Sequence, residues 1–371
     1  MQESDLPAIT ARLLWAAFGL SAVFGALAQR THFCTMGAIA DVVSMGDWTR
    51  MRMWALAIAV AVIGFNGMVG LGWIEARHSL YAGPQLLWLS ALAGGVLFGI
   101  GMVLASGCGS KSLVRLGGGN LKSLVVLAVL GLAALATMRG LTAVWRVATV
   151  DAVALQLPPG QDLPSLLAAW LGLPVRSVAW PLGLAAGLAL LAWVLRQPEG
   201  RSANVWLGGA GSGAVVVAMW WLSGRAGHVL EHPVTLEETF LATRSHRMES
   251  LGMVAPVGDA LDWVLYFSDA SRLLTMGIAS VAGMLAGSAV VALASRSFRW
   301  EGFANAEDLA NHLVGAALMG IGGVTALGCT VGQGLSGVST LSLGSMLALA
   351  GIAAGGVAAL RYQLWRLEQQ A

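Results

Sequence analysis

The chain has 371 residues, of which 57% are hydrophobic and only 11% are Asp, Glu, Lys or Arg. A soluble domain carries about 25% charged residues, and so few charges cannot cover a surface that faces water. The composition therefore excludes a cytosolic enzyme, a disordered chain and a nucleic-acid-binding protein. It indicates a polytopic membrane protein. Because the apolar stretches are continuous and do not alternate with polar residues, the spans are expected to be helices.

Nine apolar stretches approach the roughly 20 residues that a helix needs to cross a bilayer. In chain order they are 13–28, 53–73, 86–106, 121–138, 177–195, 204–222, 272–294, 309–328 and 342–363. We expect an all-α bundle that forms a single membrane domain over residues 1–371. Many stretches carry two glycines four residues apart, a spacing that lets helices approach closely in lipid. These pairs are Gly95 and Gly99, Gly183 and Gly187, Gly209 and Gly213, Gly283 and Gly287, and Gly351 and Gly355.

The positions of the basic residues suggest an orientation. With nine spans, 12 of the 21 Lys and Arg residues fall on one side of the membrane. Positive residues concentrate on the cytoplasmic side, which places the N-terminus outside and the C-terminus in the cytoplasm. The long segments 140–175 and 223–271 then lie outside. We expect the second of them to form short amphipathic helices over the mouth of the bundle.

Residues 98–127 resemble residues 319–349. Both stretches place Gly-Ile-Gly shortly before a Gly-Cys pair and continue through a Gly- and Ser-rich segment into a new apolar span. With nine spans the two copies have opposite orientations. We therefore predict inverted repeats over 1–140 and 201–371, joined by a linker, 141–200, that contains an extra span. Inverted repeats with interrupted spans are typical of transporters, with the substrate site where the repeats meet. Tandem duplication as a way of building a large membrane protein is the alternative.

The segments that follow Cys108 and Cys329 are too polar and too short to cross the membrane. We predict that each is re-entrant: it enters from one face, turns and begins a short helix, and the two together give the bundle an hourglass shape. Four glycines would permit the tight turns and a close backbone approach: Gly107, Gly109, Gly328 and Gly332. The N-termini of the short helices would present N–H groups to an anion.

The sequence contains three cysteines, Cys34, Cys108 and Cys329, and each lies at a break in an apolar stretch. Their odd number and wide spacing argue against disulfides, and no metal site or cofactor is predicted. A free cysteine is most often a small buried hydrophobe. Two of these three, however, occupy equivalent repeat positions, which favours a substrate pathway lined by soft sulfur atoms. A thiolate would repel an anion, so the thiols are expected to be neutral.

Polar side chains near the breaks are candidates for supporting the substrate. With the four glycines named above, the predicted set contains Ser110, Lys111, Thr330 and Gln333. Lys111 and Arg115 would attract an anion, or would serve only to anchor the chain at the cytoplasmic face. Gln333 and Ser336 would donate to an oxyanion, or would form ordinary hydrogen bonds between helices.

Three motifs carry a resemblance to a known family: RTHFCTMGAIAD at 30–41, ASGCGSKSLVRLG at 105–117 and ALGCTVGQGLSG at 326–337. There the chain resembles the YeeE/YedE (sulphur-transport) family of bacterial inner-membrane proteins, and the resemblance covers nearly the whole chain. It implies thiosulfate uptake, an hourglass of membrane helices with re-entrant loops, and a path lined by the three cysteines. It also implies a small cytoplasmic sulfur-carrier protein with a TusA-like fold as a partner.

Other functions stay open at this point. The first alternative is a different solute, either a selenium compound or another sulfur species, since some branches of the family are linked to selenium metabolism. A membrane sulfurtransferase that holds a persulfide on Cys108 or Cys329 is a second class of function, and a structural subunit of a larger complex is a third. We expect a transporter and not an enzyme.

Overall fold

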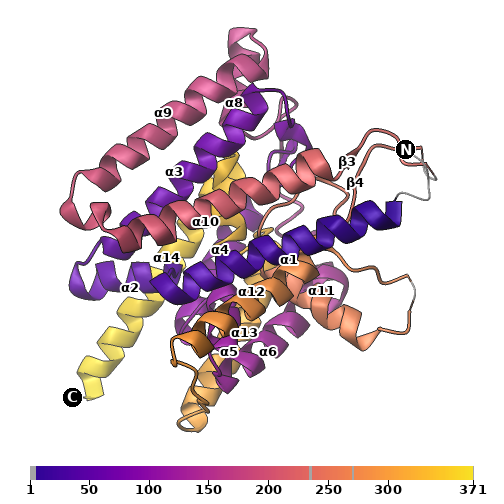
Figure 1. The fold of residues 1–371 in the computed structure, drawn as a ribbon. Coiled ribbons are helices and arrows are strands. Elements are labelled where there is room, and N and C mark those ends of the chain that lie inside the picture. The colour runs from indigo at the N-terminus through magenta and orange to yellow at the C-terminus, as the bar shows by residue number, and fades with distance from the viewer. Residues whose placement is uncertain (1–5, 234–235, 270, 371) are drawn as a thin grey trace.

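The computed structural model describes residues 6–233, 236–269 and 271–370. The fold is a bundle of long helices (Figure 1). They are α1 (Leu6–Thr31), α3 (Thr49–Gly70), α4 (Trp88–Leu104), α6 (Leu121–Arg139), α9 (Val175–Leu195), α10 (Ala203–Trp221), α12 (Met276–Ala294), α13 (Ala306–Thr325) and α14 (Leu343–Gln370).

Shorter elements connect or interrupt these helices. Five are α-helical: α2 (Thr35–Met45), α5 (Gly109–Gly117), α7 (Leu141–Ala148), α8 (Leu163–Leu171) and α11 (Val254–Leu265). Two are 3₁₀-helical, η2 (Ala76–His78) and η3 (Pro198–Arg201), and two are π-helical, η4 (Leu222–Ala226) and η5 (Gly332–Gly337). Two antiparallel pairs of two-residue strands complete the fold: β1 (Gln85–Leu86) with β2 (Leu155–Gln156), and β3 (His228–Val229) with β4 (Thr239–Phe240).

The predicted all-α polytopic fold is confirmed. Among the described residues, eight helices are long and apolar enough to cross a membrane, and they match eight of the nine predicted stretches. The ninth stretch, 309–328, forms α13 but does not reach that standard. The reason is the polar start of α13, where Glu307 and Asp308 occupy the first turn and His312 follows one turn later. The expected short helix in 223–271 is α11.

Close helix contacts account for the glycine pairs. A Cβ atom added to Gly283 or Gly287 of α12 would overlap backbone carbonyls of α1. Gly95 and Gly99 of α4 lie in the same way against the backbone of α14. The other three predicted pairs also meet a neighbouring helix at distances that leave no room for a side chain. The five predicted glycine contacts are thus confirmed, and tight packing replaces the hydrophobic effect that lipid does not supply between helices.

The packing partners of the helices follow a pattern. Helix α1 packs along α12, and α10 packs along α3. Helix α4 packs along α14, and α13 packs along α6. Helices α4 and α13 contact each other, and α9 packs on the outside of α3.

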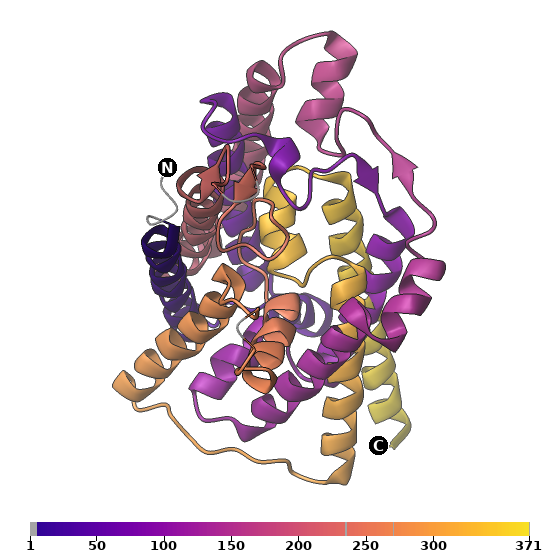
Figure 2. The same ribbon diagram turned by 90° about the vertical axis from the view of Figure 1, so that its right-hand side faces the viewer.

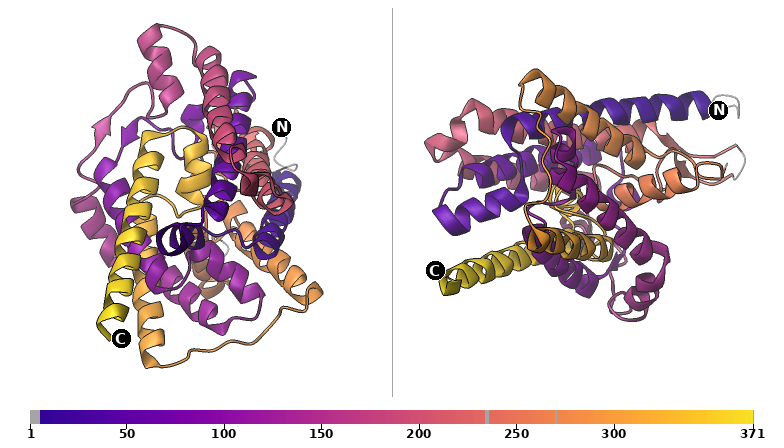
Figure 3. Two further views of the ribbon diagram at one scale, coloured as in Figure 1. Left: turned by 90° about the vertical axis from the view of Figure 1, so that its left-hand side faces the viewer. Right: turned by 90° about the horizontal axis from the view of Figure 1, so that it is seen from below.

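The bundle has two distinct sides. Helix α1 begins near the β3–β4 hairpin, whereas α14 ends on the opposite side of the molecule (Figure 1 and right panel of Figure 3). The end of α14 and the connection between α12 and α13 lie together at the bottom of Figure 2, away from the hairpin. We call the hairpin end of the molecule the hairpin side. The segment that contains η5 lies at the centre of the bundle (Figure 2), and residues 329–342 are all buried.

Candidate functional site

Each of the three cysteines follows the same local backbone feature. The residue two positions before the cysteine has a left-handed conformation: φ is 55° at His32, 53° at Ser106 and 58° at Leu327. Non-glycine residues adopt this conformation rarely, at a cost of roughly 1–2 kcal/mol. Its recurrence at three sites shows that the surrounding structure holds the chain in these turns.

The turns before Cys108 and Cys329 are the same helix-ending motif. At the first, the amide of Gly107 donates to Met102 O at 2.8 Å and that of Ser106 donates to Val103 O at 3.1 Å. At the second, Gly328 donates to Gly323 O at 2.8 Å and Leu327 donates to Val324 O at 3.0 Å. Both are Schellman caps, which satisfy the last carbonyls of α4 and α13.

The left-handed position is therefore not a glycine. The turn was expected to rest on Gly107, Gly109, Gly328 and Gly332, but none of these four has a positive φ. Space is the reason for glycine at Gly107 and Gly328, where a Cβ atom would lie 3.0 Å from Lys111 Cγ and 3.1 Å from Gln333 Cγ. At Gly109 the nearest atom would be 3.5 Å away, an ordinary contact.

Cys34 and Cys329 each accept a hydrogen bond from the backbone amide three residues later. The thiol of Cys34 accepts from the amide of Gly37 at 3.4 Å, and the thiol of Cys329 accepts from the amide of Gly332 at 3.4 Å. Both lie in the sequence pattern Cys-Thr-x-Gly, which is a signal visible in the sequence. Each sulfur thus lies where a backbone N–H of a helical segment points.

Cys108 differs. It precedes α5 without a side-chain cap, and its sulfur lies 3.1 Å from the hydroxyl of Ser110. Ser110, one of the residues predicted to support the substrate, therefore lies beside this cysteine. Lys111 takes the position that Gly37 and Gly332 occupy after the other two cysteines.

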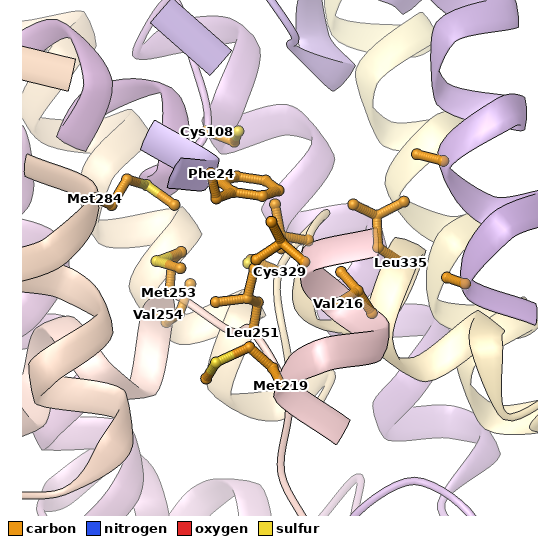
Figure 4. Close-up of a cluster of buried hydrophobic side chains, with 14 of the residues drawn as sticks. Phe24, Cys108, Val216, Met219, Leu251, Met253, Val254, Met284, Cys329 and Leu335 are labelled. Carbon is orange, nitrogen blue, oxygen red and sulfur yellow. The ribbon is translucent and has the colours of Figure 1, made fainter. Parts of the chain in front are cut away.

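The three thiols are buried and close together. Their exposed fractions are 6% for Cys34, 1% for Cys108 and 0% for Cys329. Cys108 lies near both of the others. Figure 4 draws Cys108 and Cys329 in one cluster of buried side chains with Phe24 and Met253.

A small cavity of about 10 Å³ lies where the three breaks meet. It is lined by Cys34, by Ser110 from the start of α5 and by Val331, which follows Cys329 by two residues. Two buried donors on its wall, Thr35 Oγ1 and Trp54 Nε1, find no hydrogen-bond partner among the described residues. A volume of this size holds about one water molecule, so this cavity is closed to larger solutes in this conformation.

A larger cavity of about 290 Å³ opens on the hairpin side, and sequence reasoning did not predict it. Its walls come from η2–β1, α11 and the end of α13, and they include Gly328, the residue before Cys329. Four thioether side chains line it: Met138, Met219, Met253 and Met276. Thioethers are soft and polarisable, so this wall suits a polarisable solute.

Charged side chains also line the larger cavity. Arg146 and Arg244 contribute two guanidinium groups, and Glu249 and Asp259 contribute two carboxylates. Arg244 pairs with Asp259 at 2.8 Å. Burial raises the pKa of Asp259 to about 6, and the neighbouring guanidinium only partly offsets this effect. Protonation of Asp259 near that pH leaves the positive charge of Arg244 uncompensated.

Gly332 keeps a narrow space open between the larger cavity and Cys329. A Cβ atom at this position would lie 3.3 Å from the hydroxyl oxygen of Tyr81 and 3.9 Å from Cys329 Sγ. Tyr81 itself lines the larger cavity. A side chain at position 332 would therefore fill the space between the cavity wall and the thiol.

The remaining candidates have different surroundings. Thr330 Oγ1 and Gln333 Oε1 are buried and have no hydrogen-bond partner among the residues described. The amide of Gln333 donates to Ala326 O, and the hydroxyl of Ser336 donates to Leu251 O at 2.8 Å. Ser336 therefore forms an internal hydrogen bond, which was the alternative to donating to an oxyanion. Thr330 Oγ1 and Gln333 Oε1 keep their hydrogen-bonding capacity unused among the described residues.

The two basic residues after Cys108 have different surroundings in the structure. Arg115 donates to Ser106 O at 2.9 Å and so fastens the end of α4. Lys111 is half-buried and close enough to interact electrostatically with both Cys34 and Cys108. Arg115 also lies near Cys34, but its guanidinium is engaged by Ser106 O, whereas Lys111 lies near both Cys34 and Cys108.

Comparisons with known proteins agree with the resemblance seen in the motifs. A family model described as sulphur transport matches residues 30–358. The thiosulfate transporter TsuA of Escherichia coli K12 is 27% identical over 318 residues, which cover 85% of this chain and 84% of the relative. The thiosulfate transporter TsuA of Spirochaeta thermophila is 26% identical over 336 residues, or 91% of this chain and 94% of the relative.

A shorter match supports the same assignment. The probable transporter YedE of Escherichia coli K12 is 35% identical over 92 residues, which cover 25% of this chain and 21% of the relative. The family model extends over far more than half of the chain and includes all three cysteine motifs. The chain therefore belongs to the sulphur transport (YeeE/YedE) family of membrane proteins.

Proposed function

We propose that this protein is a transporter that takes up thiosulfate, a small anion with a terminal sulfur atom, along a pathway lined by Cys34, Cys108 and Cys329. The observation that carries the proposal is the meeting of three buried cysteine turns around one small cavity with unpartnered donors. Thiols and thioethers suit the terminal sulfur, and the hydroxyl and N–H donors suit the oxygens. The names of the two long relatives support thiosulfate as the solute.

The order of sites along the pathway is inferred from the cavities. Thiosulfate enters the larger cavity, where Arg244 and the methionine wall hold it, and then reaches Cys329 past Tyr81 and Gly332. It next passes the small cavity to Cys34, Cys108 and Lys111. Because that cavity holds only about one water molecule, passage requires the segments around it to move apart.

The proposed inverted repeat, 1–140 with 201–371, is supported by the packing pattern. Cys108 and Cys329 are separated by the same number of residues as Gly94 and Gly315, and as Gly101 and Gly322. Across the contact between α4 and α13, Gly94 meets Gly322, and Gly101 meets Gly315. Exchanging the two halves converts one contact into the other, which is the behaviour of a two-fold axis between α4 and α13.

This symmetry supports the rest of the proposed architecture. It pairs α1 with α10, α3 with α12 and α6 with α14, so the α1–α12 contact corresponds to the α10–α3 contact. The turns before Cys108 and Cys329 then dip into the bundle from opposite faces as re-entrant segments. The hairpin side is proposed as the outer face of the bacterial inner membrane. The opposite side is the cytoplasmic face, where a TusA-like sulfur carrier is the proposed partner.

Uptake of labelled thiosulfate into proteoliposomes that contain only this protein tests the proposal. We expect uptake that is lost in Cys329→Ala and Cys108→Ala and retained in Ser295→Ala, whose hydroxyl is exposed and bonds only local atoms. Normal uptake in a variant that lacks all three cysteines would overturn the cysteine pathway.

Mass spectrometry of the protein after turnover separates transport from sulfur transfer. A membrane sulfurtransferase would retain an extra sulfur atom on Cys108 or Cys329, whereas a transporter with neutral thiols leaves all three cysteines unmodified. Competition by selenate and other selenium or sulfur oxyanions identifies the solute. Uptake that responds only to a selenium compound would replace thiosulfate in the proposal.

A further inference from the structure

Three metal-binding side chains converge on the hairpin side, away from the cysteines. His78 ends η2, His228 begins β3, and Glu238 immediately precedes β4. His228 Nε2 lies 2.6 Å from Glu238 Oε1, and His78 Nδ1 lies 3.8 Å from the same oxygen. The three ligand atoms all lie within 4.8 Å of one another.

The spacing of these atoms fits a zinc ion. Zn²⁺ binds histidine nitrogen and carboxylate oxygen at 2.0–2.2 Å with tetrahedral geometry, so its ligand atoms are about 3.4 Å apart. The two distances to Glu238 Oε1 bracket this value, and a displacement of less than about 1 Å at each side chain brings all three atoms to it. In the structure, His228 Nε2 and Glu238 Oε1 share a hydrogen bond.

Packing holds the two imidazole rings in place. The ring of Phe240 stacks on His228 at 4.7 Å and contacts His78 at 5.6 Å between ring centres. The carbonyl of His78 accepts from Met248 N at 2.9 Å, which fixes the backbone of η2. Ligands that neighbouring groups orient in advance bind metals more tightly.

We propose that His78, His228 and Glu238 form a binding site for Zn²⁺, with water in the fourth position. Two histidines and one carboxylate are a ligand set that Zn²⁺ prefers, whereas the hard ions Mg²⁺ and Ca²⁺ prefer oxygen alone. The three side chains are partly exposed, so the ion reaches them from solution.

The ion would join two segments that continue into the wall of the larger cavity. Leu80 and Tyr81 follow His78 and line that cavity, and Arg244 follows β4 and lines it from the other segment. Zn²⁺ therefore fastens the β3–β4 hairpin to η2, two segments whose continuations line the larger cavity. Binding of Zn²⁺ to these three side chains does not depend on thiosulfate transport.

Zinc titration of the full-length protein tests the site. The protein, purified in detergent, is stripped with a chelator and titrated with Zn²⁺ in a calorimeter, and bound metal is measured by mass spectrometry. We expect one Zn²⁺ per chain, an increase in Tm on binding, and a loss of affinity of about tenfold or more in Glu238→Gln and His228→Ala. The matched control, Glu237→Gln, removes a neighbouring carboxylate outside the cluster and retains the affinity.

Substitution with Co²⁺ reports the coordination directly. A site with two imidazoles and one carboxylate gives a visible absorption band typical of tetrahedral Co²⁺, and we expect this band to disappear in Glu238→Gln. The glutamine has the shape of glutamate, so a folded Glu238→Gln variant separates lost ligation from misfolding. Absence of saturable Zn²⁺ binding, equal binding in all variants, or equal affinity for Mg²⁺ would each overturn the proposal.

Discussion

The breaks at Cys108 and Cys329 share a backbone turn but continue into different kinds of helix. Both begin with a left-handed residue and a Schellman cap, at Ser106 and Leu327. Cys108 then leads into the regular helix α5, which carries the cation Lys111. Cys329 leads into the π-helical η5, which is fully buried and has neutral polar side chains. The same kind of turn thus positions two cysteines, while the residues after it give each break its own chemistry.

The largest effect is expected from filling the space beside Cys329. In Gly332→Val the side chain occupies the gap between Tyr81 and the thiol, so uptake should fall by about tenfold or more, equivalent to at least about 1.4 kcal/mol. Gly109→Ala, at the other break, has room for its methyl group and should retain most of the uptake. The measurement is the initial rate of labelled thiosulfate uptake in proteoliposomes. Equal losses of uptake in the two variants would show that the space beside Cys329 is no more important for uptake than the space beside Cys108.

The next effect concerns the charge that distinguishes the Cys108 break. Lys111→Gln removes a positive charge near two thiols, and uptake should fall by about fivefold, since such a charge close to an anion contributes about 1 kcal/mol in a solvated site. Lys122→Gln is the control, because Lys122 is occupied by an ion pair with Asp308 at 2.6 Å. Uptake rates at low and high salt check the origin of the effect. Normal uptake in Lys111→Gln would contradict this role and would indicate that Lys111 only anchors the chain at the cytoplasmic face.

A smaller effect on uptake is expected from a change of pH, through the charged residues of the larger cavity next to the Cys329 break. The pKa of Asp259 is about 6, raised by burial, so lowering the pH from 7.5 to 5.5 protonates it and frees the charge of Arg244. Uptake should rise by roughly two- to threefold over this range. In Asp259→Asn the uptake rate should be high and nearly independent of pH. Because the folded pKa lies above the unfolded value, the contribution of this group to stability is present at low pH and is lost as pH rises through about 6. An unchanged pH profile in Asp259→Asn would contradict this role.

The smallest effect tests the turn that the two breaks have in common. Ser106→Gly and Leu327→Gly each relieve a left-handed non-glycine residue, which costs roughly 1–2 kcal/mol. Glycine also makes the unfolded chain more flexible, by roughly 0.5–1 kcal/mol, so each variant should gain about 0.5 kcal/mol in the free energy of unfolding. Thermal unfolding in detergent measures the gain. A gain at one position and a loss at the other would show that the two turns are held differently.

The long apolar stretches predicted most of the fold, because a helix in lipid depends mainly on its own composition. Eight of nine predicted spans have the length and apolarity for a membrane, and the glycine pairs lie at helix contacts. The exception is α13, whose apolar part is long but whose first turn is acidic. The buried carboxylate of Asp41 forms an ion pair with Arg50 at 3.0 Å, because an unpaired acid is costly within a membrane protein.

The candidate site was predictable only in part. The cysteines are visible as three motifs, and the pattern Cys-Thr-x-Gly marks two of them. The larger cavity has no such signal, because Met138 lies on α6, Met219 on α10 and Met253 directly before α11, and none of them stands out in its own segment. Lys111 and Arg115 look alike in the sequence, and only the hydrogen bond from Arg115 to Ser106 separates them.

By itself the sequence determined that the chain is a helical membrane protein, where its helices run, and which cysteines interrupt them. Composition and periodicity are sufficient for this, since each span satisfies its own backbone hydrogen bonds. The tertiary structure alone decided that the segments of the three cysteines meet at the small cavity, that Tyr81 lies near Cys329 across Gly332, and that His78 lies beside Glu238. Such contacts join residues that are far apart in the chain, and helix packing, which no local pattern encodes, brings them into reach.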